Sequence, residues 1–140
     1  MEAFDKSKVV MDTPITFPEF VDPETQRDVA DSHTFSQGAW ETIGQFRDAP
    51  PGVKKAVIPV NIKEYCMMVI TEVGPNTSVR KHSHKEGIVR YIINGTLLQS
   101  GVQYSAGDWV FVPPGVPYEI TTKGGYKAMC LYRNYCDGGE

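Results

Sequence analysis

The sequence predicts an all-β protein, a sandwich or a barrel built from short strands. Short runs rich in valine, isoleucine, tyrosine and phenylalanine follow one another between residues 56 and 132, and strands favour these residue types. Glycine, proline and asparagine interrupt the runs roughly every eight to twelve residues, which is the spacing typical of such folds. No segment has a clear helical period, although residues 39–48 could form a short helix or a strand.

The individual strands are expected where the apolar runs lie. They cover residues 56–60, 65–73, 88–93, 96–100, 108–112, 118–122 and 126–132. Among the breaks between them, Asn94–Gly95 gives the strongest hairpin signal, because both residues tolerate the positive φ of a tight turn. We therefore expect a hairpin between the third and fourth of these strands.

The N-terminal part of the chain has a different character. Residues 1–39 are rich in proline, aspartate, threonine and serine and show no period, so they are expected to form an extended arm that covers a sheet edge. The arm would also suit a homodimer, since two-fold dimers are the commonest oligomers. Residues 40–140 are then the barrel, and His33 in the arm is expected to be an exposed loop residue.

Composition and charge narrow the class of protein. The chain has 140 residues, 41% of them hydrophobic and 22% charged, which fits one globular domain with a modest core. Its net charge of −3, without a basic block, argues against nucleic acid or an anionic membrane as a partner. No apolar run is long enough to cross a bilayer, and the N-terminus lacks a signal-peptide pattern. We therefore expect a soluble, cytoplasmic protein.

The three cysteines do not form a recognisable framework. Their number is odd and no Cys-x-x-Cys pair is present, which argues against disulfides and a structural zinc site. Cys66 and Cys130 lie in apolar runs and are expected to be small buried hydrophobic residues.

Chemistry-bearing residues gather between positions 79 and 97. If residues 78–84 form one strand, Arg80, His82 and His84 share a face, because strand side chains alternate. Two imidazoles placed in this way can converge on one metal ion. On the next strand Arg90 is expected to face inward, where it needs either a carboxylate of the protein or an anionic ligand.

Two spaced motifs make the chain resemble a cupin over roughly residues 55–132. The first cupin motif is His-x-His, three or four residues, Glu, six residues and Gly, and His82, His84 and Gly95 match it. The second motif is Gly, five residues, Pro-x-Gly, two residues, His, three residues and Asn. The stretch 107–115 matches its first half, with Gly, Pro and Gly in place. The resemblance implies a double-stranded β-helix, the cupin or jelly-roll barrel, behind the extended arm.

The chain departs from the cupin pattern at two of the four metal-ligand positions. Ile88 or Val89 stands where the glutamate is expected, and Tyr118 stands where the second motif has histidine. Glu86 could supply the missing carboxylate or remain a solvated turn residue. Tyr118 could donate a phenolate, act as general acid or base, or be a buried tyrosine with a satisfied hydroxyl.

Three functions follow as hypotheses. The first is a metal-dependent cupin enzyme, a dioxygenase or an isomerase or cyclase, acting on a small polar or anionic organic molecule. His82 and His84, with Glu86 or Tyr118, would hold divalent Fe, Mn, Zn or Ni, while Arg90 holds an oxyanion and Tyr118 handles a proton. Apolar side chains would line the barrel, with Met67, Val69, Ile92, Phe111 and Ile120 as candidates.

The second hypothesis is a metal-free cupin that works by acid–base catalysis. His82 or His84 would be the general base and Tyr118 the acid, as in a cyclase, epimerase or dehydratase, and an imidazole pKa of about 6.5 suits proton transfer near neutrality. The third hypothesis is a non-catalytic cupin that binds a small ligand, since the fold alone does not fix the function.

Overall fold

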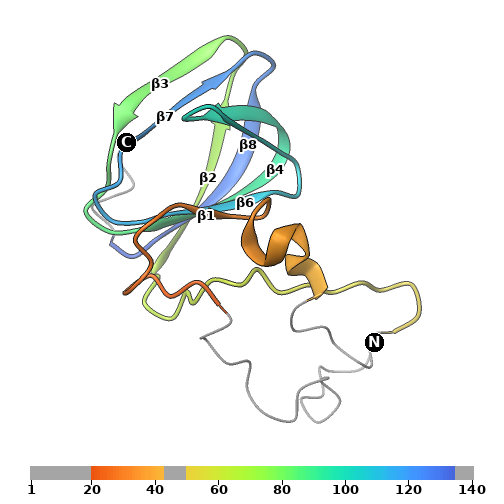
Figure 1. The fold of residues 1–140 in the computed structure, drawn as a ribbon. Helices are drawn as coiled ribbons and strands as arrows, with labels where there is room; N and C mark the ends of the chain where they lie inside the picture. The colour runs from red at the N-terminus through yellow and green to blue at the C-terminus, as the bar shows by residue number, and fades with distance from the viewer. Residues whose placement is uncertain (1–19, 43–49, 135–140) are drawn as a thin grey trace.

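A barrel of antiparallel strands makes up most of the computed structural model, which describes residues 20–42 and 50–134 (Figure 1). The all-β double-stranded β-helix predicted from the sequence is confirmed. Its strands are β1 (Ala30–Asp31), β2 (Met67–Val73), β3 (Thr77–His82), β4 (Ile88–Gln99), β5 (Val102–Ser105), β6 (Trp109–Val112), β7 (Tyr118–Thr122) and β8 (Tyr126–Tyr132). Two short 3-10 turns, Phe35–Gly38 and Trp40–Thr42, follow β1.

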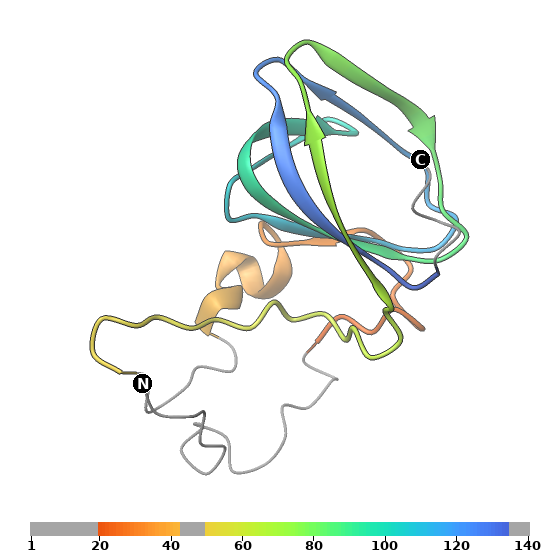
Figure 2. The same cartoon turned by 180° about the vertical axis from the view of Figure 1, so that it is seen from behind.

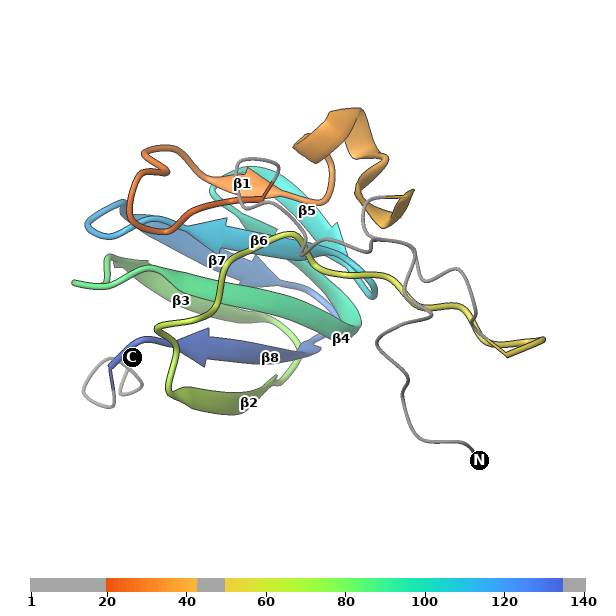
Figure 3. The same cartoon turned by 90° about the horizontal axis from the view of Figure 1, so that it is seen from below.

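Two sheets share the long strand β4. The first sheet has the order β1, β6, β4, β8, β2, with all neighbours antiparallel (Figure 3). In the second sheet the C-terminal part of β4 pairs with β5 and β7, and β7 pairs with β3. Seen from behind, β2 lies beside β8 at one edge, before the chain turns into β3 (Figure 2). Because β4 runs through both sheets, its two halves lie on different walls of the barrel.

The predicted hairpin at Asn94–Gly95 is wrong, because these residues lie within β4. The β4–β8 register shifts between Ile92 and Asn94, which marks a bulge. Gly95 has a φ of +80° there, and a Cβ atom at this position would lie 2.6 Å from the Cα atom of Tyr126. The tight turn comes later, at Ser100 and Gly101, which both have positive φ and join β4 to β5.

The bulge changes which residues of β4 face the barrel interior. Before it, Ile88 and Ile92 belong to the interior core and Arg90 is buried. After it, Leu97 and Gln99 are buried while Leu98 is 44% exposed. Inward positions are thus even-numbered before the bulge and odd-numbered after it, since one extra residue reverses the alternation of a strand.

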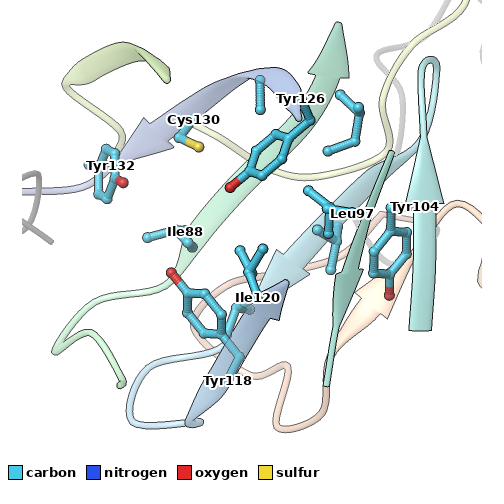
Figure 4. Packing of buried hydrophobic residues seen from close by; sticks show 12 residues of the cluster. Ile88, Leu97, Tyr104, Tyr118, Ile120, Tyr126, Cys130 and Tyr132 are labelled. Atoms are coloured by element: carbon cyan, nitrogen blue, oxygen red, sulfur yellow. The ribbon is translucent and has the colours of Figure 1, made fainter. Parts of the chain in front are cut away.

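The barrel interior is packed with apolar and aromatic side chains from both sheets (Figure 4). Met67, Val69, Ile92 and Ile120 belong to this core or pack against it, as predicted. Phe111 does not, and its predicted inward position is wrong. It packs on the outer face of the first sheet, in a second core.

The second core explains why Phe111 faces outward. It joins Val21, Ala30, Trp40 and Val60 from the segments before β2 to Val89, Trp109 and Phe111 of the first sheet. The outer face of the sheet is therefore covered at β6, where all four residues are buried. The strand predicted at 56–60 is absent from the structure, where only Val60 forms an isolated parallel bridge with Val21.

Buried polar contacts fasten the segment around β1 to the barrel. Tyr104 donates a hydrogen bond of 2.5 Å to Asp31, which also accepts hydrogen bonds from the backbone of residues 33 and 34. The Asp108 carboxylate accepts hydrogen bonds from Ser32 at 2.8 Å and from the backbone amide of Ser105. His33 is exposed, as predicted, and its Nε2 lies 3.2 Å from Asp108.

The predicted burial of the two cysteines is right for one of them and wrong for the other. Cys130 is buried at 2% exposure, but Cys66 is exposed, because it lies ahead of β2 rather than within a strand.

Among the described residues, no helix has the length and apolar character needed to cross a membrane.

Candidate functional site

His82 and His84 lie side by side at the end of β3, although they do not belong to one regular strand. β3 ends at His82, and its register against β7 shifts between Val79 and His82. Because of this shift Arg80 is exposed, so the prediction that it shares a face with the two histidines is wrong. His84 follows the strand, is only 6% exposed, and its ring centroid is 5.1 Å from that of His82.

Backbone contacts connect the histidine segment to the turn before β7. The carbonyl oxygen of His84 accepts a hydrogen bond of 2.8 Å from the amide of Gly115, which has a φ of +74°. Within the same turn the Val116 amide donates to the carbonyl of Pro113. The two sequence motifs are therefore adjacent in space, and β7 begins directly beside the histidines.

Tyr118 points into the barrel from the start of β7 (Figure 4). It is the register partner of His82, and in the sequence it stands at the histidine position of the second cupin motif. The Tyr118 hydroxyl lies 2.9 Å from Nε2 of His84, and the two rings are stacked with centroids 5.9 Å apart. The structure thus brings His82, His84 and Tyr118 together in one cluster.

Arg90 completes the cluster from β4 and is 4% exposed. Its Nη2 donates to the Tyr118 hydroxyl at 3.2 Å, and its Nη1 donates to Oε1 of Gln99 at 2.5 Å. Burial disfavours the charge on Arg90, but the adjacent Cys130 and Tyr118 outweigh burial and raise its pKa above the ordinary value. Arg90 is therefore a buried cation whose side-chain hydrogen bonds go to a phenol and an amide.

These contacts indicate in which direction the Tyr118 proton is shared. A phenol has one O–H donor, and its oxygen also accepts hydrogen bonds. Arginine only donates, so the Tyr118 oxygen accepts from Arg90. The Tyr118 O–H can then donate to His84, whose Nε2 accepts the hydrogen bond. In this arrangement His84 is placed to receive the proton of Tyr118.

Two further tyrosines line the same interior from β8. The hydroxyl of Tyr126 points inward, and Tyr132 stands near Cys130 (Figure 4). Burial is the main cause that raises the pKa of Tyr126 and of Tyr132. Both therefore remain neutral phenols that can donate hydrogen bonds.

The residues around the two histidines supply a limited donor set for a metal ion. Nε2 of His82 is buried and has no hydrogen-bond partner within the described part of the chain, while its Nδ1 lies 2.9 Å from the Arg80 carbonyl oxygen. The Glu86 carboxylate instead lies 3.7 Å from Nη1 of Arg133. In residues 20–42 and 50–134 no group of three histidine, cysteine, aspartate or glutamate side chains could hold a metal ion. Two imidazoles and the Tyr118 phenol would fit a weakly bound divalent ion, with fewer strong ligands than the usual three.

Gln99 belongs to this cluster and was not found by sequence analysis. It is 3% exposed and is bonded to Arg90. Simple alternation along β4 from Arg90 would have turned Gln99 outward, and the bulge at Asn94–Gly95 reverses that direction. An Asn-Gly pair within a strand pattern was the signal available, because such a pair can also mark a bulge.

Comparisons with known proteins agree with the fold. The model of the ChrR cupin-like domain matches residues 39–134, whereas no curated protein matches the chain. Similar solved structures include an RmlC-like cupin from Shewanella frigidimarina NCIMB 400, with 26% identity over 47% of this chain and 63% of that chain, at a TM-score of 0.44. A cupin-2 domain-containing protein from the same organism has 20% identity over 54% and 76%, at a TM-score of 0.46.

A predicted oxalate decarboxylase from Thermotoga maritima has 22% identity over 49% of this chain and 66% of that chain, at a TM-score of 0.42. The matched region spans less than two thirds of the length of the first of these structures. With TM-scores of 0.42 to 0.46, these structural likenesses carry no conclusion about the reaction.

Proposed function

Because the chain belongs to the ChrR cupin-like family, which its match over residues 39–134 shows, we propose that it is an enzyme acting on a small organic anion inside the barrel. Tyr118 and His84 move a proton, and Arg90 holds the anionic group of the substrate. The observation that carries this proposal is the position of the Tyr118 oxygen, 2.9 Å from His84 Nε2 and 3.2 Å from Arg90 Nη2.

The proposed chemistry is proton transfer next to a carboxylate. Arg90 stabilises negative charge both on Tyr118 and on the substrate, because the charge of a buried guanidinium is poorly screened. When His84 accepts the phenolic proton, the Tyr118 oxygen can take a proton from the substrate carbon and later return it. Isomerisation, epimerisation, and many cyclisations and dehydrations use such a step. The closely packed interior around Ile88 and Ile120 limits the access of water.

The test follows exchange of substrate protons with deuterated water. The protein is incubated with a panel of small 2-oxo and 3-oxo acids, and loss of their α-proton signals is recorded by NMR. We expect exchange of at least one acid to slow by about 10²-fold or more in Tyr118→Phe, the range of a lost general acid–base group. Tyr126→Phe is the matched control, since it removes another interior phenol that does not bond His84. Equal exchange in Tyr118→Phe and the native protein would refute the proposal.

A metal-dependent enzyme is a second candidate, favoured by the buried Nε2 of His82, to which no other residue of the described ranges is hydrogen-bonded. His82 and His84 would hold the divalent ion, with the Tyr118 phenol as a third donor. A bound ion would polarise a carbonyl or an enolate of the substrate. Elemental analysis of the purified protein and of His82→Ala tests this candidate. Near-stoichiometric metal that is lost in the variant supports it, whereas no uptake after anaerobic reconstitution contradicts it.

We also propose that the protein forms a homodimer through β2, by its open edge and its outward-facing apolar side chains. Among the described residues, β2 pairs only with β8, so its other edge is open. Met68 and Ile70, on the outward side of β2, are 72% and 55% exposed. An apolar groove of about 610 Å³ runs beside Met68, Met129 and Leu131. A second copy related by a two-fold axis would present the same edge and the same apolar residues.

A further inference from the structure

Gln99 makes a contact with Arg90 that cancels none of its charge. The two side chains come from different walls of the barrel, since Arg90 lies in the half of β4 that pairs with β6 and β8, and Gln99 in the half that pairs with β5 and β7. Both are more than nine-tenths buried, with exposures of 4% and 3%. Oε1 of Gln99 accepts from Nη1 at 2.5 Å. A glutamate at this position would have the same length and would supply a counter-ion.

The positive charge of Arg90 is not balanced by the side chains that the structure describes. The ion pairs found among residues 20–42 and 50–134 do not include Arg90. Tyr118 and Cys130, which raise the pKa of Arg90, would balance its charge only as phenolate or thiolate, and as phenol and thiol they carry no charge. A buried cation without a counter-ion is costly, so the interior favours any molecule that brings one negative charge to the guanidinium.

We propose that Gln99 sets the charge of the ligand, so that the barrel accepts a monoanionic carboxylate and rejects the neutral isostere of the same shape. The inference rests on the proposed function, because it concerns the anion that Arg90 holds. It goes further in naming the ligand charge and the residue that determines it. Gln99 fixes the orientation of the guanidinium through a neutral contact, and the ligand supplies the counter-ion. Gln99 is thus a specificity-determining residue, and it does not touch the reacting atoms.

The position of Gln99 depends on a local feature of β4. The bulge at Asn94–Gly95 turns Gln99 inward, and the glycine is required there because a Cβ atom would collide with Tyr126. Without the bulge, the inward residue near the end of β4 would be Leu98, and Arg90 would face an apolar side chain. The bulge therefore places the Gln99 amide beside Arg90 at this point of the interior.

Acetate and acetamide are suitable probes, because they have nearly the same shape and differ by one charge. Each is titrated at constant ionic strength into the full-length protein, and binding is read from the imidazole NMR signal of His84. We expect the native protein to bind acetate at least about tenfold more tightly than acetamide. In Gln99→Glu the acetate affinity should fall about tenfold or more, and the preference for acetate should disappear. Gln99→Leu, which keeps the net charge, should retain the preference for acetate.

A stability measurement on the ligand-free proteins separates this inference from the proposed function. Gln99→Glu supplies a counter-ion, so its unfolding midpoint in urea at neutral pH should lie above that of Gln99→Leu and at or above that of the native protein. An unchanged acetate preference in Gln99→Glu, or a midpoint below that of Gln99→Leu, would overturn the role of Gln99. If the native protein does not bind acetate but Gln99→Glu has a raised unfolding midpoint, Arg90 does not bind an anion and the proposed function is refuted. The raised midpoint would still show that the charge of Arg90 lacks a counter-ion at the position of Gln99.

Discussion

Replacing Gly95 with alanine should destabilise the barrel more than the same replacement at Gly101. Both residues have positive φ, +80° and +87°, so alanine costs about 1–2 kcal/mol at either site. At Gly95 the new Cβ would also lie 2.6 Å from the Cα atom of Tyr126 and closer still to the carbonyl oxygen of Gly125, whereas nothing lies within 4 Å at Gly101. Overpacking of this kind costs a further ~1–3 kcal/mol. We therefore expect Gly95→Ala to lose about 2–5 kcal/mol in total.

Urea unfolding followed by tryptophan fluorescence measures both variants, since the two tryptophans, Trp40 and Trp109, lie in the outer core. The difference between the variants isolates the close approach of β4 and β8 at the bulge, because the backbone cost is common to both. Equal losses in Gly95→Ala and Gly101→Ala would refute the reasoning. They would mean that the two strands are not held together as tightly as the bulge geometry requires.

Two further predictions concern the arm and the proposed dimer. Burial disfavours the charge on Asp108, but hydrogen bonds from the Ser105 amide and the Ser32 hydroxyl outweigh burial and lower its pKa. The stability that ionised Asp108 contributes is fully present above the unfolded aspartate pKa of about 3.9. It is lost as the pH falls through the lower pKa that Asp108 has in the folded protein. Asp108→Asn should therefore cost about 1–2 kcal/mol of unfolding free energy at pH 7, and a cost that persists undiminished at pH 3 would contradict this. For the dimer, Met68→Lys should give a monomeric mass by light scattering at micromolar concentration, while Leu98→Lys on the other sheet should not; a native protein that is already monomeric would contradict the proposal.

The strand content could be predicted from the sequence because apolar alternation and breakers are local signals. The inward face of Ile88 and Ile92, and the inward position of Arg90, followed from that alternation alone. Phe111 could not be placed in this way, because the segments before β2 cover the outer face and leave every residue of β6 buried. Alternation vanishes from a strand that is buried on both sides.

The candidate site was predicted in part, for a related reason. His82, His84 and Tyr118 come together as motif spacing suggested, and Arg90 joins them as strand alternation suggested, whereas Glu86 lies beside Arg133. The Glu86 side chain extends from the turn before β4. A periodic pattern of apolar residues does not predict the direction of a side chain in a turn. Gln99 was not predicted because the bulge inserts one extra residue into β4. The insertion reverses the face to which every later side chain of the strand points.

The hydrogen bond between Tyr118 and His84 is the centre of the proposed mechanism, and nitrogen NMR of the imidazoles tests it directly. The chain has only three histidines, so each signal can be assigned with one substitution. At about pH 8, where a free imidazole is neutral, we expect Nε2 of His84 to be an unprotonated acceptor whose signal shifts in Tyr118→Phe but not in Tyr126→Phe. A His84 Nε2 that carries its own proton, with the same signal in Tyr118→Phe, would contradict the account.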